Sequence, residues 1–138
     1  MTLVRRPDWE QRLVALVRER RTMAYRYGVN DCGTFMLDAV ATMTGVDLLP
    51  GVTRPTGWLS AAKFFIARGW DDVEDMATEL LGEPVGPAAS RPGDVVSFER
   101  DDELHLAVRV GSDAVTPTQL GLDVVMAAQW RRRAWLVG

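Results

Sequence analysis

The hydrophobic period of the sequence changes at Pro92, and this change constrains the fold more than any other feature. Before Pro92, apolar residues recur every three or four positions in several segments, as on the buried face of a helix. After Pro92, short runs alternate apolar and polar residues and are separated by glycine, proline or acidic turns, a pattern typical of strands. The order predicts an α+β fold, with N-terminal helices packed on a C-terminal antiparallel sheet of about five short strands.

The pattern also gives the approximate bounds of each element. Helices are expected at residues 9–21, 32–44, 58–68 and 73–81. Strands are expected at residues 94–99, 104–110, 114–116, 122–125 and 134–137. Asp8 and Gln11 predict a capping box at the first helix. No internal repeat divides the sequence, so residues 1–138 are expected to form a single domain.

Composition excludes several classes of function. The net charge of -3 argues against nucleic acid as a partner. One cysteine excludes an internal disulfide, and a single cysteine with a single histidine leaves too few ligands for a zinc site, so we expect no metal and no cofactor. No apolar run approaches the roughly 20 residues that span a bilayer. The N-terminal residues lack the apolar core of a signal peptide, which predicts synthesis in the cytoplasm.

The cysteine, Cys32, falls where the second helix should begin. Asn30 and Asp31 precede it and are good caps for the free amide groups of a first helical turn. A thiol at a helix N-terminus feels the positive end of the helix dipole, which favours the thiolate. The sequence therefore places a candidate nucleophile at the start of residues 32–44.

The only histidine, His105, lies in the second expected strand. A cysteine at a helix start facing a histidine on a nearby strand is the geometry of a thiol nucleophile and its base. Two interpretations stay open on residue types alone. Either the two residues form a catalytic pair, or Cys32 is a buried small hydrophobe and His105 an exposed strand residue.

Three sequence blocks, in order, resemble the NlpC-like branch of the papain-fold cysteine peptidases. They are Tyr25-x-Tyr27-Gly28-x-x-Asp31-Cys32-Gly33, then Arg91-Pro92-Gly93-Asp94-Val95-Val96-Ser97-Phe98, then His105-Leu106-Ala107-Val108-Arg109-Val110-Gly111. The whole chain is more similar still to a small NlpC-like family encoded in phage and prophage tail modules, which has a tryptophan in its first helix and ends in an Ala-Trp strand. Here that strand is Ala134-Trp135-Leu136-Val137.

The resemblance implies a role for each matching residue. Cys32 would be the nucleophile and His105 the base, Tyr25 would place its hydroxyl near the thiol, and Asp31 would cap the helix. The third catalytic position, which orients the histidine, is His, Asn or Gln in the relatives. In this chain Thr116 is closest in register, and Gln119 is chemically better but lies past the expected strand.

The chain departs from the active relatives at two further positions. Gly33-Thr34 stands where the relatives usually have Ser-Gly after the cysteine, and Ala107 stands where they usually have glycine. Two functions therefore remain open. One is a cell-wall peptide hydrolase that uses Cys32 and His105, and the other is a catalytically inactive, papain-like structural module.

The resemblance also implies a place of action in both cases. The chain would be a component of a phage tail or tail tip, present in the host cytoplasm during assembly and then in the virion tail. Its partners would be other tail proteins and, for a hydrolase, peptidoglycan stem peptides. Five tryptophans would suit a protein interface. Trp9, Trp58 and Trp135 are expected in the core, and Trp70 and Trp130 on the surface.

Overall fold

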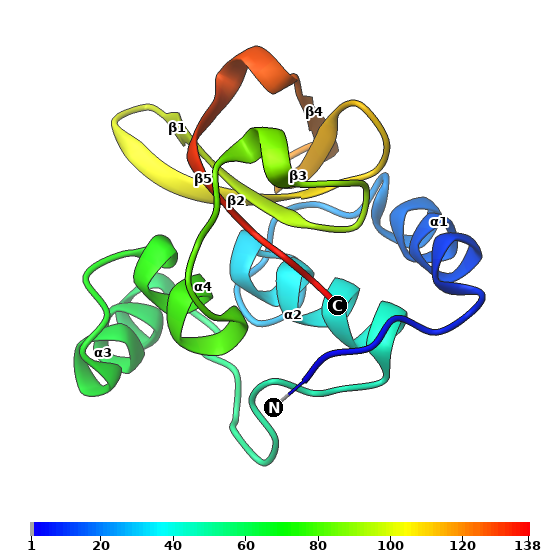
Figure 1. Cartoon of the computed structure of the whole chain (residues 1–138). Coiled ribbons are helices and arrows are strands. Elements are labelled where there is room, and N and C mark those ends of the chain that lie inside the picture. Colours follow the sequence, from blue (N-terminus) through cyan, green and yellow to red (C-terminus); the bar gives the residue numbers. More distant parts are fainter. Residues whose placement is uncertain (1) are drawn as a thin grey trace.

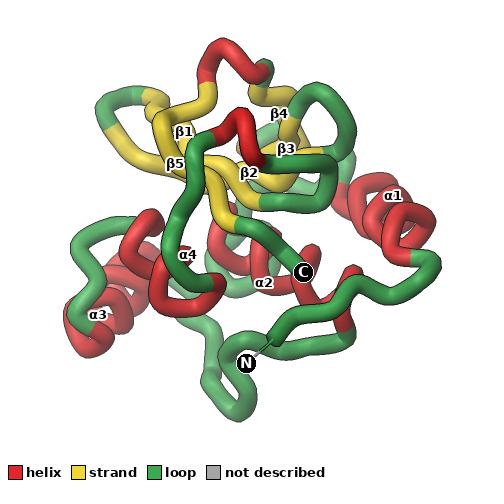
Figure 2. The backbone as a smooth tube through the Cα atoms, viewed as in Figure 1, coloured by secondary structure: helices red, strands yellow, loops and turns green. Residues whose placement is uncertain are grey.

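The computed structural model describes residues 2–138, except for the side chain of Arg132, and has four helices followed by five strands (Figure 1). The helices are α1 (Trp9–Arg20), α2 (Cys32–Thr44), α3 (Trp58–Arg68) and α4 (Val73–Leu81). The strands are β1 (Val95–Arg100), β2 (Glu103–Arg109), β3 (Ala114–Thr118), β4 (Gly121–Val125) and β5 (Trp130–Trp135). The predicted α+β class and element order are confirmed, because the change of hydrophobic period at Pro92 separates the helices from the sheet (Figure 2).

The five strands form one antiparallel sheet in the order β4-β3-β2-β1-β5. The last strand differs from the prediction, since it begins at Trp130 and not at Ala134. Trp130 pairs with Phe98 of β1, and the ladder shifts register between Val96 and Phe98. The arginines after Trp130 break the apolar alternation, and for that reason the sequence pattern alone missed the first half of β5.

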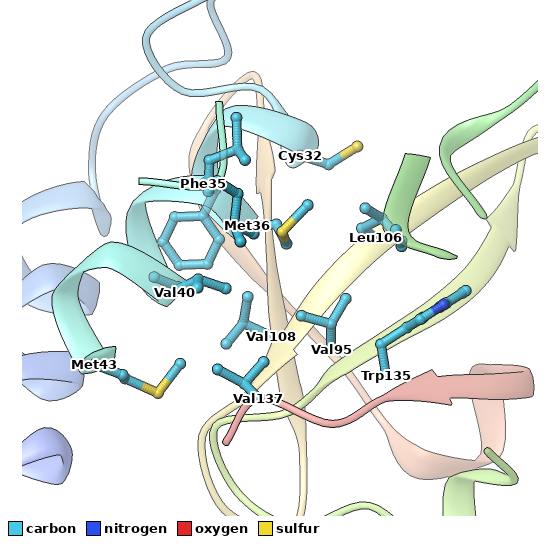
Figure 3. Packing of buried hydrophobic residues seen from close by; sticks show 14 of the residues in the cluster. Cys32, Phe35, Met36, Val40, Met43, Val95, Leu106, Val108, Trp135 and Val137 are labelled. Atoms are coloured by element: carbon cyan, nitrogen blue, oxygen red, sulfur yellow. The ribbon is translucent and has the colours of Figure 1, made fainter. Parts of the chain in front are cut away.

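The main core lies between α2 and one face of the sheet. α2 contributes the fully buried Phe35, Met36, Val40 and Met43, and the strands contribute residues such as Val95 and Val108 (Figure 3). A smaller cluster on the other face of the sheet includes Val96, Phe98, Ala107 and Ala134. Adjacent residues of one strand point to opposite faces, so β1 and β2 supply apolar residues to both clusters.

Asp94 joins the two ends of the chain to the start of β1. Its buried carboxylate accepts hydrogen bonds from Arg5 Nη2 at 2.8 Å, from the backbone amide of Val137 at 2.8 Å and from that of Arg91 at 2.9 Å. Burial lowers the pKa of Arg5, and the charge of Asp94 opposes that shift. The Gly-Asp pair of the second sequence block is therefore a structural element of this chain.

Three local predictions are wrong. Asp8 makes no capping hydrogen bond to the backbone of α1, because its carboxylate accepts from Arg12 Nε at 2.9 Å instead. Trp58 and Trp70 have exchanged environments, since the Trp58 side chain is 69% exposed and that of Trp70 only 5%. Trp135 is fully buried, as predicted.

Among residues 2–138, no helix is both long enough and apolar enough to cross a membrane.

Candidate active site

Cys32 is the first residue of α2, and the chain reaches it through a tight turn. Asp31 caps the helix as predicted, since its carboxylate accepts from the Thr34 amide at 2.8 Å and from the Gly28 amide at 2.7 Å. Gly28 has a φ of 78°, and a Cβ there would lie 2.7 Å from the carbonyl oxygen of Pro55. Only glycine combines this conformation with such a close approach, so the turn before Cys32 depends on it.

A pocket of about 440 Å³ opens beside the cysteine. Cys32, His105 and Tyr25 all line it, together with Glu103 and Leu104 of β2. The remaining lining comes from the turn before α2, from α2 and the loop after it, from α3 and the connection to α4, and from α4: Tyr27, Asp31, Gly33, Thr34, Leu37, Leu49, Val52, Arg54, Pro55, Trp58, Ala61, Ala62, Phe64, Phe65, Ile66, Trp70, Asp71, Val73 and Met76. The structure therefore brings the predicted nucleophile, base and tyrosine to one cavity, which sequence spacing could not show.

Cys32 is only 9% exposed, and its side chain points away from Phe35 and Val40 (Figure 3). Burial raises the pKa of the Cys32 thiol to about 11, and the charge of Asp31 adds to this. Backbone amides of Leu106, Gly33 and Cys32 itself act in the opposite direction but do not compensate. The thiolate expected at a helix start is therefore not favoured, and Cys32 is a neutral thiol at neutral pH.

We expect alkylation of Cys32 by iodoacetamide at neutral pH to be about 100-fold slower than that of an ordinary thiol, because a shift of two pKa units lowers the thiolate fraction by that factor. The alkylation rate should rise with pH toward a midpoint near 11. Intact-protein mass spectrometry measures the alkylated fraction over time. The protein unfolded in urea serves as the control and should titrate at the ordinary value. A midpoint below that of the unfolded protein would mean that the thiolate is stabilised.

His105 lies near the start of β2, directly opposite Phe98 of β1. The two rings are stacked, with centroids 5.3 Å apart and planes inclined by 24°. Strand alternation directs Leu106 to the α2 side, so His105 projects from the opposite face of the strand. Within the described residues, no hydrogen bond joins His105 to Cys32, although both line the pocket.

Thr116 does not orient the imidazole. Its hydroxyl is buried and donates to the carbonyl oxygen of Leu106 at 2.9 Å. The β2–β3 register pairs Val108 with Val115, and continuing it places Thr118 opposite His105. The structure thus gives Thr116 a backbone partner, and the register favours a residue that the sequence analysis did not select.

Thr118 also has other hydrogen-bond partners. Its hydroxyl donates to the Gly121 carbonyl at 2.8 Å and accepts from the Leu120 amide at 3.2 Å. Gln119 is exposed at the end of β3, as its position past the expected strand implied. A polar group that fixes the His105 tautomer is therefore not provided by these three residues.

Tyr25 is placed next to Cys32 by the backbone of β3, because its amide donates to the Thr118 carbonyl at 2.9 Å. Burial and then the charges of Cys32 and Tyr27 raise the pKa of Tyr25 far above its ordinary value. Its hydroxyl therefore stays protonated at any working pH and can act as a donor beside the thiol.

Among the described residues, no group of three or more His, Cys, Asp and Glu side chains is placed to hold a metal ion.

Solved structures with the same architecture define the class of fold. The chain is similar to Rv1477, described as a hypothetical invasion protein of Mycobacterium tuberculosis, with a TM-score of 0.53 and 14% identity. It is also similar to a mutated form of the Resuscitation Promoting Factor Interacting protein RipA, with a TM-score of 0.54 and 14% identity. Each match covers 94% of this chain but only 62% of the other. The protein thus has an NlpC-like, papain-like fold.

The family of the chain is shown by a comparison of its sequence with models of protein families. Residues 4–137 match the model of the family described as a domain of unknown function, DUF6950, and the chain belongs to this family. A search of curated proteins found no significant match.

Proposed function

We propose that the chain is a cysteine hydrolase that cleaves an amide bond in a peptide. The single observation that carries this proposal is that Cys32, His105 and Tyr25 line one pocket on an NlpC-like fold. The reaction class follows from the residue types, because a thiol beside an imidazole is suited to acyl transfer. The backbone amides of Gly33 and Leu106 next to the sulfur are suited to hold a developing oxyanion.

The raised pKa of Cys32 favours general-base attack over a preformed ion pair. As the sulfur bonds to the acyl carbon, the thiol proton moves to His105, and the imidazolium then protonates the leaving amine as the C–N bond breaks. Water next attacks the thioester, supplies a hydroxyl to the acyl carbon and returns a proton to the sulfur. The products are a carboxylic acid and an amine, and the thiol is restored.

Replacing Cys32 by alanine is expected to lower peptide hydrolysis by about a thousandfold or more, since no second nucleophile is provided. The resemblance to cell-wall enzymes makes peptidoglycan stem peptides the first substrates to try, alongside a panel of unrelated peptides. Release of free amines is the readout. The control is the surface variant Asp123→Ala, which should keep full activity because Asp123 is not part of the pocket lining. Equal activity of the Cys32→Ala and control proteins would exclude this function.

We further propose that the protein acts in a phage tail or tail tip, during assembly in the host cytoplasm and afterwards in the virion. Two features of the sequence support this role: Trp9 in the first helix and the Ala134-Trp135 strand, both shared with the tail-module family. The expected partners are other tail proteins. A purified protein that stays monomeric and binds no tail protein would count against this proposal.

A second candidate function is a papain-like module of the tail that performs no catalysis. The observation that favours it is the state of the site, with a neutral Cys32 thiol, a His105 ring stacked on Phe98 and a Thr116 hydroxyl held by Leu106. This alternative predicts stable association with a tail protein and no peptide hydrolysis. Hydrolysis that depends on Cys32 would exclude it.

A further inference from the structure

The pocket beside Cys32 is walled on one side by a helix that has no buried residue. α3 packs at the edge of the molecule, beside α4 and away from the sheet (Figure 1). Its apolar residues line the pocket, and they include Trp58, Phe65 and Ile66. Phe65 is partly buried and also packs against the main core. An amphipathic helix whose apolar face lies along a cavity leaves that face to whatever occupies the cavity.

The charges around the pocket select against acidic occupants. Three carboxylates line it, from Asp31, Asp71 and Glu103, against one guanidinium, that of Arg54. Arg54 Nη1 is already paired with Asp38 Oδ1 at 2.9 Å. A carboxylate of a substrate would therefore meet an excess of negative charge and no free cation in the lining, a like-charge arrangement that discriminates against acidic partners.

Trp70 lies behind this apolar wall. Its ring is 5% exposed and packs edge-to-face on Phe65, with centroids 5.3 Å apart. The indole Nε1–H is buried, and no hydrogen-bond partner is found for it in the described part of the chain. Because this nitrogen is sealed from the cavity, Trp70 contributes its apolar ring and no hydrogen-bond donor to the pocket.

We infer that the pocket selects a peptide whose acyl side carries a large apolar side chain and no carboxylate. The apolar side chain lies along α3, and the scissile acyl carbon is held at Cys32. This inference rests on the proposed function for the bond that is cut, and it replaces acidic stem peptides with neutral, apolar segments of polypeptide as the substrate class. Trp58 and Phe65 are the specificity-determining residues.

Binding can be measured without turnover in the full-length Cys32→Ala protein by isothermal titration calorimetry. The probes are blocked peptides of equal length that differ only at one position, with phenylalanine, alanine or glutamate, and a peptidoglycan stem peptide. We expect the phenylalanine peptide to bind about tenfold more tightly than the alanine peptide, because it buries an aromatic side chain, and the two acidic peptides to bind most weakly.

A matched pair of variants on α3 tests the position of the site. Trp58 lines the pocket, whereas its neighbour Leu59 is exposed and is not part of the lining. In the same Cys32→Ala background, Trp58→Ala should weaken binding of the phenylalanine peptide by about fivefold or more, and Leu59→Ala should leave it unchanged. Both positions are more than half exposed, so neither variant is expected to disturb folding.

The outcomes separate this inference from the proposed function. Tightest binding of the stem peptide, equal binding of all probes, or equal effects of the two α3 variants would overturn the inference, even if the wild-type protein hydrolyses peptides. Selective binding of the phenylalanine peptide without any hydrolysis by the wild-type protein would support the pocket assignment and overturn the proposed catalysis.

Discussion

Replacing Asp94 by alanine is expected to destabilise the protein by about 3–5 kcal/mol, the range found when one partner of a buried ion pair is removed. Asp94 is fully buried, and the substitution would leave Arg5, whose side chain is 8% exposed, without its counter-ion. It would also remove the acceptor of the Val137 and Arg91 amides. The free energy of unfolding can be measured by urea denaturation, followed by tryptophan fluorescence.

Asp123 provides a matched control for this measurement. Its carboxylate pairs with Arg100 at 3.3 Å, but the Asp123 side chain is 56% exposed. Exposed ion pairs contribute about 0–1 kcal/mol, so Asp123→Ala should stay within that range of the wild type. Equal losses in the two variants would contradict the assignment of Asp94 as the residue that joins the two termini to the sheet.

Replacing His105 by alanine is expected to lower peptide hydrolysis by about 10²–10⁴-fold, which is the contribution of a positioned general acid–base. The sequence has no second histidine that could substitute. The variant should also change the shape of the pH–rate profile, a readout that a purely structural role of His105 would not change. Circular dichroism should confirm that the fold is intact.

The control for this experiment is again Asp123→Ala, which changes a surface residue of β4 outside the pocket lining. Its rate and pH profile should match those of the wild type. If His105→Ala keeps both the rate and the profile, His105 is not the base, and the stacking on Phe98 is its only role.

The sequence was sufficient for the element order because periodicity reports directly on which residues are buried. The sequence prediction failed where tertiary packing decides which side chains are buried. Trp58 and Ile66 have the spacing of a core-facing stripe, yet they line the pocket and remain exposed. Trp70, directly after the glycine that ends α3, reads as a surface residue but folds under the helix against Phe65.

The protonation state of Cys32 is a second property that local sequence did not predict, and two free-energy contributions explain why. The helix dipole at the start of α2 is worth about 0.3–1 kcal/mol in favour of the Cys32 thiolate. Raising the thiol pKa to about 11 corresponds to about 3 kcal/mol against it. Burial therefore outweighs the dipole, and burial of a single side chain cannot be read from local sequence.

The sequence also failed to identify the residue that lies level with His105, for a different reason. Sequence spacing placed Thr116 closest to His105, but the position opposite His105 depends on the strand register, which follows from the length of the turn at Gly111-Ser112-Asp113. Thr116 and Thr118 share one face of β3, so the register alone decides which of them lies level with His105. Thr116 consequently meets the Leu106 backbone, and the register brings Thr118 level with the histidine.

The most direct test of the central claim, that Cys32 is a nucleophile for acyl transfer, is intact-protein mass spectrometry after mixing the full chain with activated peptide esters and quenching in acid. We expect one acyl adduct per chain in the wild-type protein, located on Cys32, and none in Cys32→Ala. Absence of any adduct in the wild type, or an equal adduct in Cys32→Ala, would contradict it.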